Sequence, residues 1–332
     1  TAYRRQRQMC IRDRLSELKG LADISLDPEY GSIVGFTTQE LKDYFSGYIE
    51  NAARQLEAEP EALLQRLTGY YDGYCFEKTA TVRVMNPWSV MSFLIYPTRG
   101  FRDHWFQSGG QPSVLKDLFR SGALKDPKNF AAVKTIPFSQ LGGPAIGENF
   151  SEVDLLTQTG YLTFKSVDGN IAIVDYSTEE VRHAMAGMYL HQLLGKTIEQ
   201  AGVMDFAIRL VKDNPETLVR IFNRLLESVD YEAYSIEDAK SVLAVIQVAM
   251  INVRLSPVIK VIAKGESVLE VQAGERTIVL TLEYCHPDQE AEQLLQVAVS
   301  QLDKPFSGKL GGSMEILKLV LVFSESDRRI TV

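Results

Sequence analysis

The residues best suited to hydrolytic chemistry are two glutamates near the C-terminal end of the sequence, Glu270 and Glu283. Carboxylate oxygens are the ligands that Mg²⁺ prefers, and a hydrolytic metal site also needs a cation or base beside the attacking water. Lys260 and Lys264 are the candidates for that cation. If these residues form a site, its cofactor is Mg²⁺; otherwise we expect no cofactor.

The spacing of apolar side chains predicts the elements that would position these residues. Runs of β-branched and aliphatic residues predict strands, a glycine between two of them predicts a hairpin turn, and apolar residues three and four apart predict a helix. The expected strands are 258–263, 268–271, 277–284 and 316–323, with a turn at 273–275 and a helix over 288–299. Residues two apart on a strand share a face, so Glu270 shares the face of Val268 and Glu283 that of Thr281.

This order of strand, turn, strand and helix resembles the catalytic core of the PD-(D/E)XK nuclease superfamily. In that core an Asp on the first strand and a Glu-x-Lys pair on the second hold a divalent metal and a hydrolytic water. The ungapped match places Val268 where the Asp belongs, Thr281 where the Glu belongs and Glu283 where the Lys belongs. Gln296 matches the Gln of the following helix. The resemblance therefore implies a nuclease fold that has lost its cleavage site.

Three functions stay open for this region. The first is a cleavage-deficient nuclease-like domain with a regulatory or scaffolding role. The second is a metal-dependent nuclease whose site has moved to Glu270 and Glu283. The third is a protein-interaction module without a nucleic-acid role, which suits the net charge of −8 and the pI near 5.2.

A second group of motifs lies between residues 15 and 182. Residues 70–76 read YYDGYCF, 85–89 read MNPWS, 104–105 read HW and 108–109 read SG. These strings resemble the C-terminal half of a bacterial AAA-ATPase-like domain that accompanies PD-(D/E)XK modules, with Tyr70 in place of a tryptophan. The strings QTGYL at 158–162 and EEVR at 179–182 recur in the same family. The resemblance implies a helical, lid-like region and self-association through it.

Asp72 and Asn86 are the polar residues of these motifs that could contact a nucleotide or a neighbouring subunit. Because Asp and Asn before Gly and Pro favour turns, we expect both to cap turns instead. Thr37 with Glu40 predicts a capping box at the start of a helix, and a further helix is expected over 59–70.

A nucleotide-binding P-loop needs G-x-x-x-x-G-K-[ST], in which the lysine reaches the β- and γ-phosphates. The nearest string is GGPAIGEN at 142–149, where Glu148 replaces that lysine. We expect a surface loop there, and we expect the nucleotide-binding half of the family to lie upstream of this sequence. Residues 1–14 contain five arginines and predict either a basic nucleic-acid arm or a non-native, disordered tail.

The middle of the sequence predicts a small winged-helix-like linker, with strands at 161–165 and 171–175 joined by a turn at 168–170. Ser177 or Thr178 is expected to cap the next helix. Lys165 and Arg182 are too few to predict DNA binding, and His183 and His191 have no partner at metal-ligand spacing.

Residues 198–254 predict helices. The last of them has Ser235 as its expected N-cap with Asp238 three residues on. Glu237 or Asp238 could supply an acidic metal ligand, but a capping role is the expected one.

Composition limits the remaining classes. Cys10, Cys75 and Cys285 are widely spaced, which suits a reducing compartment, and no run of about 18 apolar residues predicts a membrane span. We therefore expect a cytoplasmic α/β protein, with nucleic acid a partner by family association only. Its expected parts are the tail at 1–14, the ATPase-like region at 15–125, the winged-helix-like linker at 126–197, and at 198–332 a helical segment with a restriction-endonuclease-like mixed sheet flanked by helices.

Overall fold

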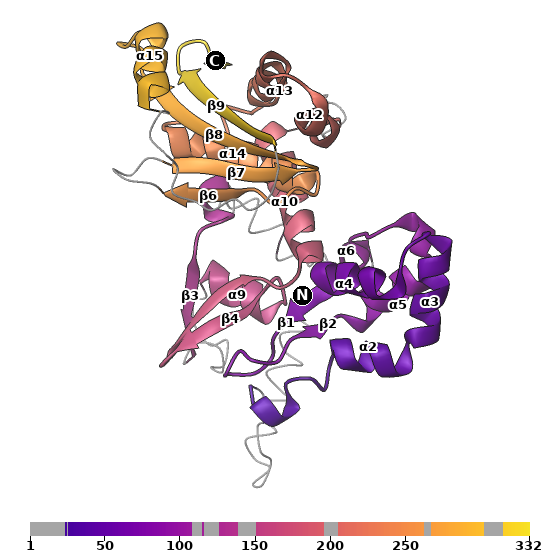
Figure 1. Cartoon of the computed structure of the whole chain (residues 1–332). Helices are drawn as coiled ribbons and strands as arrows, with labels where there is room; N and C mark the ends of the chain where they lie inside the picture. Colours follow the sequence, from indigo (N-terminus) through magenta and orange to yellow (C-terminus); the bar gives the residue numbers. More distant parts are fainter. Residues whose placement is uncertain are drawn as a thin grey trace. The chain divides into compact units, whose positions relative to one another are not determined.

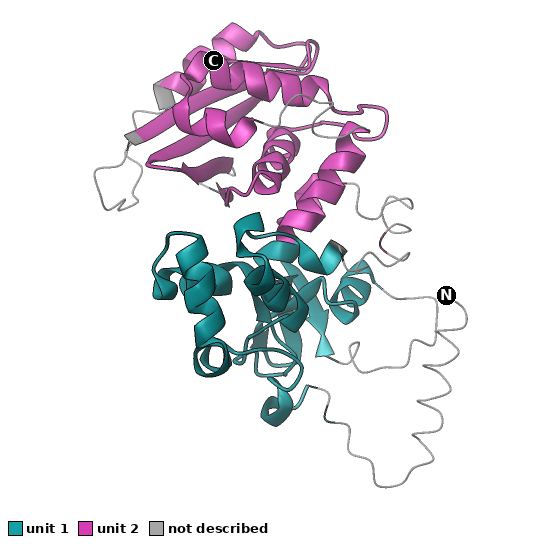
Figure 2. Ribbon diagram, turned by 90° about the vertical axis from the view of Figure 1, so that its right-hand side faces the viewer, with its two compact units in different colours: residues 1–110, 133–181 teal, residues 111–132, 182–332 magenta. Residues whose placement is uncertain are grey.

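The computed structural model describes residues 24, 26–107, 115, 126–138, 151–195, 205–261, 267–301 and 315–332. The chain divides into two compact units, which are coloured separately in Figure 2. Unit 1 contains residues 1–110 and 133–181, and unit 2 contains residues 111–132 and 182–332. The fold is mixed α/β, and the described residues form a two-stranded, a three-stranded and a five-stranded sheet (Figure 1). The expectations for residues 1–14, 108–109 and 142–149 and for Lys264 fall outside the described residues.

The first half of unit 1 is helical. Thr37 and Glu40 form the predicted capping box: the Thr37 hydroxyl accepts from the Glu40 backbone, and Glu40 accepts from the Thr37 backbone. The helices bury their apolar faces in one core that includes Leu41, Leu67 and Phe93, each fully buried. These helices are α2 (Thr38–Tyr44), α3 (Ser46–Gln55), α4 (Pro60–Tyr71) and α5 (Pro87–Ile95). The same half contains α6 (His104–Gln107) and the short 3₁₀ turns η1 (Pro28–Tyr30) and η2 (Pro97–Arg99).

The second half of unit 1 is a three-stranded sheet with helix α9 (Glu152–Gln158) beside it. Its antiparallel order is β3 (Lys134–Pro137), β5 (Ile171–Tyr176), β4 (Leu162–Asp168), so the predicted hairpin is confirmed and β3 is an addition to it. Helix α10 (Glu179–Leu194) follows, and Thr178 is the predicted cap, accepting from the Val181 N–H at 3.2 Å.

The two halves of unit 1 are joined through β1 (Asp72–Tyr74), which pairs with β2 (Val84–Met85). The Thr163 hydroxyl on β4 accepts from the Cys75 N–H at 2.8 Å and donates to the Cys75 carbonyl at 2.9 Å. At Gly73 (φ 141°) a Cβ would lie 2.1 Å from the Ser177 carbonyl oxygen, so the backbone contact leaves no room for a side chain.

Gly73→Ala should therefore destabilise unit 1 by roughly 3 kcal/mol or more, because the residue adds both backbone strain and a clash with a carbonyl. The measurement is the urea midpoint of unfolding. Gly169→Ala is the matched control, since Gly169 also has a positive φ (59°) but nothing within 4 Å of its Cβ position. Equal effects of the two substitutions would contradict the close approach.

A buried carboxylate organises the loop after β1. Glu77 is fully buried, and its oxygens accept from the backbone N–H groups of Thr79 at 2.6 Å, Thr81 at 2.5 Å and Val82 at 3.0 Å, and from the hydroxyls of Thr79 and Thr81. Burial alone would raise the pKa of Glu77, but these donors together lower it to about 2.

Because the pKa of Glu77 in the folded state lies below its usual 4.5, its stabilisation should be complete above pH 4.5 and lost as the pH falls toward 2. Glu77→Gln should lower the free energy of unfolding by roughly 2 kcal/mol at pH 7. The variant should also lose less stability than the parent as the pH falls. The measurement is the free energy of unfolding between pH 7 and 3. Glu29→Gln, at an exposed acid in the same unit, should leave the profile unchanged.

Unit 2 is built on a five-stranded sheet in the order β10-β9-β8-β7-β6. Strand β7 is antiparallel to both β6 and β8, β9 is parallel to β8, and β10 is antiparallel to β9. The bounds are β6 (Val258–Val261), β7 (Ser267–Ala273), β8 (Arg276–Cys285), β9 (Glu315–Ser324) and β10 (Arg329–Thr331). Helix α15 (Ala291–Gln301) connects β8 to β9 and contacts both strands.

Helix α14 (Ala239–Asn252) packs against β6, β7 and β8, and its residues 241–251 are all buried. The predicted cap of this helix is wrong by one turn. Asp238, rather than Ser235, is the N-cap, and its carboxylate accepts from the Ser241 N–H at 2.7 Å. Asp238 therefore caps the helix, which is the role expected for Glu237 or Asp238.

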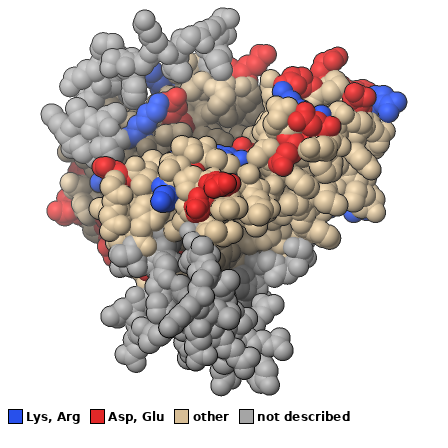
Figure 3. Space-filling model, turned by 90° about the horizontal axis from the view of Figure 1, so that it is seen from below, with Lys and Arg blue, Asp and Glu red and all other residues tan. Residues whose placement is uncertain are grey.

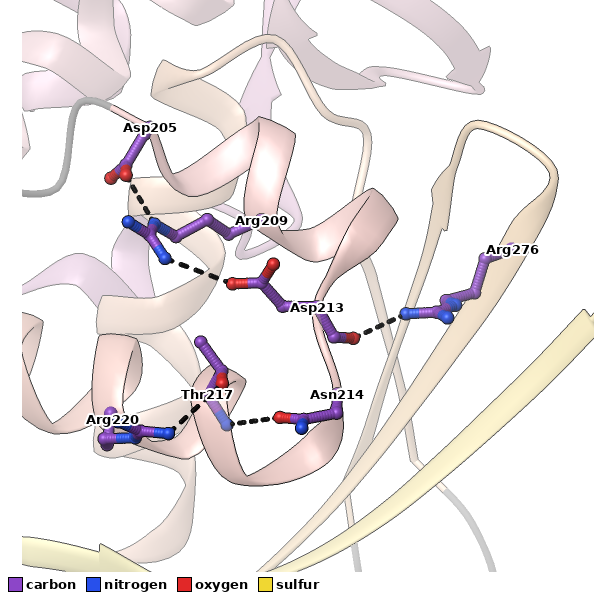
Figure 4. A network of polar contacts seen from close by, with 7 residues as sticks. All are labelled: Asp205, Arg209, Asp213, Asn214, Thr217, Arg220 and Arg276. Atoms are coloured by element: carbon purple, nitrogen blue, oxygen red, sulfur yellow. Dashed lines mark hydrogen bonds and ion pairs between the residues drawn. The ribbon is translucent and has the colours of Figure 1, made fainter.

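Helices α12 (Phe206–Lys212) and α13 (Pro215–Glu227) and the 3₁₀ turn η3 (Pro127–Asn129) also belong to unit 2. A polar network fixes the connection of α12 and α13 to the β7–β8 hairpin (Figure 4). Arg209 bridges Asp205 and Asp213, and the Arg276 guanidinium donates to the Asp213 carbonyl at 2.8 Å. Asn214 caps α13 by accepting from the Thr217 N–H at 3.0 Å. Among the helices of the described residues, none has the length and apolar character that a membrane crossing requires.

Candidate functional site

The β7–β8 register brings the nuclease-like positions together. Val268 lies directly opposite Thr281 in the antiparallel pair, and Glu283 is two residues further along β8. Because neighbouring strands lie about 4.8 Å apart, the three positions form one small patch on one face of the sheet. Lys260 on β6 is the other direct neighbour of Val268. The register thus brings Val268, Thr281 and Glu283 together, whereas the loss of a catalytic role stays a prediction.

The patch has an apolar centre. Val268 is fully buried, whereas Thr281 and Glu283 are half-buried. A valine side chain has no atom that could ligate a metal, and Thr281 offers one neutral hydroxyl in place of a carboxylate. We therefore expect this arrangement to bind Mg²⁺ only weakly, because Mg²⁺ gives up its waters reluctantly.

The alternative pair, Glu270 and Glu283, lies on the same face but is spread along it. Glu270 pairs with Val279, four residues before Glu283, which corresponds to about 13 Å along the strand. The Glu270 carboxylate instead contacts the Lys260 ammonium at 2.5 Å. The register therefore separates the two carboxylates and gives Glu270 another partner.

The remaining nuclease-like residue is Gln296 on α15, which contacts β8 and β9. Its side chain is exposed, whereas Ala298 on the same helix is buried. Within the described parts of the chain, no group of three or more His, Cys, Asp and Glu side chains is placed to hold a metal ion.

One face of the molecule shows how its charged side chains are distributed. On the face drawn in Figure 3, the Lys and Arg side chains of the described residues lie among acidic and uncharged ones and form no continuous basic patch. On the sheet, Lys260 is paired with Glu270, and this pairing reduces the positive charge available to phosphate.

The histidines and cysteines have structural surroundings. His183 is nearly buried, and its pKa is lowered to about 4 by burial and by the charges of Arg254 and Arg182. His191 is exposed. Cys75 and Cys285 are buried free thiols, and burial raises the pKa of each.

Unit 1 contains a second polar site, which sequence reasoning missed. The motif residues Tyr74, Ser89, Trp105 and Glu180 meet in its interior, where the fully buried Glu180 accepts from the Ser89 hydroxyl and the Trp105 N–H. In the sequence these residues belong to four separate motifs, and nothing in the motifs indicates that the residues lie together in space. Asn86 caps α5, as predicted, by accepting from the Trp88 N–H at 2.9 Å. The Asp72 Oδ1 atom is buried without a hydrogen-bond partner.

Comparison with known proteins assigns no family. No family model and no solved structure matches the chain. Over 152 residues, which are 46% of the chain, it is 28% identical to a protein of Azotobacter chroococcum mcd 1 described as the uncharacterized protein in the 5′ region of vnfD. The match covers 26% of that relative, so the chain spans about a quarter of the relative's length.

Val268→Asp should destabilise unit 2 by roughly 3 kcal/mol or more, because it places a carboxylate at a fully buried position without a cation of its own. Urea unfolding would measure the change. Val258→Asp is the matched control on the same face, since Val258 is 52% exposed and should change stability by less than about 1 kcal/mol. Similar losses of stability for both variants would show that Val268 does not lie in a buried, apolar environment.

Proposed function

We propose that unit 2 is a cleavage-deficient domain of the PD-(D/E)XK nuclease fold, with a regulatory or scaffolding role in an AAA-ATPase-like protein. The sheet order supports the fold: a helix, three antiparallel strands, a connecting helix and a parallel strand follow one another, as in the nuclease core. Unit 1, with its helical first half, is the ATPase-derived, lid-like part of this proposal, and its three-stranded sheet is the winged-helix-like linker.

The observation that carries the proposal is the pairing of Val268 with Thr281. At the positions where the nuclease core holds two metal-binding carboxylates, this chain has a buried isopropyl group and a hydroxyl. Glu283 adds a negative charge where the core has a lysine. Loss of a bound metal removes the stabilisation of charge that develops on the phosphate, a contribution of several kcal/mol. Each 1.4 kcal/mol changes the rate about tenfold, so we expect a loss on the order of a thousandfold or more.

The nearest competing function is a nuclease with a migrated site. The Lys260–Glu270 contact gives such a site a cation beside one carboxylate, but the register leaves Glu283 four residues away along β8. A protein-interaction role without nucleic acid agrees with the net charge of −8 and is compatible with a scaffolding domain.

A cleavage assay with Mg²⁺ and Mn²⁺ on single- and double-stranded DNA and RNA distinguishes these functions. We expect no metal-dependent cutting by the parent protein. Cutting that both Glu270→Ala and Glu283→Ala abolish would overturn the proposal in favour of the migrated site. Gln272→Ala, at an exposed position of the same strand, is the control for a nonspecific effect on β7.

The triple change Val268→Asp, Thr281→Glu and Glu283→Lys rebuilds the family's residues on the observed register. If the fold is the proposed one, the triple variant should bind Mg²⁺ in calorimetry and should be stabilised by it against urea, a readout that does not depend on cutting. The double variant Thr281→Glu, Glu283→Lys retains Val268 and should bind Mg²⁺ more weakly. Absence of Mg²⁺ binding by a folded triple variant would count against the proposed nuclease-like geometry.

A further inference from the structure

The carboxylate of Glu180 lies in the interior of unit 1 and is fully buried. It accepts from the Ser89 hydroxyl at 2.8 and 3.0 Å through its two oxygens, and from the Trp105 backbone N–H at 2.9 Å. Ser89 lies on α5 and Trp105 on α6, whereas Glu180 lies in the first turn of α10. One carboxylate therefore joins the beginning of α10 to two other helices.

The donors to Glu180 are neutral, so their hydrogen bonds do not cancel its charge. Asp103, before α6, adds a negative charge that further disfavours the ionised form. The beginning of α10 favours a negative charge through the helix dipole, but that effect is worth only about 0.3–1 kcal/mol at an exposed position. The ionisable groups around Glu180 are Asp103 before α6, His104 at the start of α6, Tyr74 on β1, and Glu179 and Arg182 on α10 itself.

The Tyr74 hydroxyl beside this carboxylate is also incompletely satisfied. Tyr74 is 7% exposed, and its hydroxyl makes no hydrogen bond of good geometry although Ser177, Asn86 and Glu180 lie close to it. A buried polar group without a partner costs free energy, and water that enters the site would satisfy both it and an ionised Glu180. Hydration can therefore open the contact that Glu180 makes with Ser89 and Trp105.

We propose that Glu180 is a proton-dependent latch, which holds the first turn of α10 against α5 and α6 when protonated and releases it when ionised. Burial, opposed by the hydrogen bonds from Trp105 and Ser89, raises the pKa of Glu180 to about 7. Its ordinary value is 4.5, so the stabilisation is complete below pH 4.5 and lost as the pH rises through about 7. The latch thus responds within the neutral range, and α10 continues along the chain into unit 2.

Hydrogen exchange of the full chain tests the proposal. After correction for the intrinsic pH dependence of exchange, peptides covering residues 86–107 and 176–190 should open roughly 30-fold more at pH 8 than at pH 5.5, the ratio expected for a pKa of 7 when closed and 4.5 when open. In Glu180→Gln, which keeps the acceptor oxygen and removes the charge, this difference should vanish. Glu179→Gln changes the same net charge one residue away and should behave like the parent.

A second variant tests the latch if Glu180→Gln does not fold. Ser89→Ala keeps the carboxylate and removes one donor that favours its ionised form, so the midpoint of the opening transition should move to higher pH. A merely structural contact would lower protection equally at all pH values in both variants. The proposal is overturned if parent and Glu180→Gln share one pH profile, or if Ser89→Ala leaves the midpoint in place.

Discussion

The pairing of β8 with a strand on each side is the constraint on which unit 2 depends. β8 pairs with β7 over six residue pairs and with β9 over ten, so its register determines which side chains share a face. A shift by one residue would exchange the two faces of the strand. It would move Leu280 and Leu282 out of the core and would separate Val268 from Thr281. The proposed function of unit 2 therefore depends on the strand register as much as on the residue types.

Two buried glutamates have opposite roles in unit 1, and the donors around them explain the difference. Glu77 accepts from the Thr79 hydroxyl and from three backbone N–H groups, which together keep it ionised despite burial. Glu180 accepts fewer donors and lies near Asp103, so burial prevails and its pKa rises. The first carboxylate holds a loop at all moderate pH values, whereas the second gives a contact that depends on pH.

Local signals predicted local structure well. The capping box at Thr37, the β4–β5 hairpin and the central strands of unit 2 each depend on residues close together in the sequence, and all were confirmed. The errors arose where several local options compete. Ser235 and Asp238 are both good caps, and the helix begins after Asp238, directly before the buried run that starts at Ser241 and is apolar from Val242 onward. Strand β3 is short and pairs with β5, a partner distant in sequence, whereas β10 is a three-residue strand that returns along β9.

The sequence by itself determined the residue types at the nuclease-like positions, the alternation of the strands and the absence of a lysine in the glycine string at 142–149. Periodicity and side-chain chemistry are properties of the chain, so these conclusions need no fold. Only the tertiary structure decided that Glu270 pairs with Lys260 rather than with Glu283, and that Ser89, Trp105 and Glu180 share one buried site. Both depend on strand register and on the packing of distant segments, and burial then sets the ionisation of Glu180.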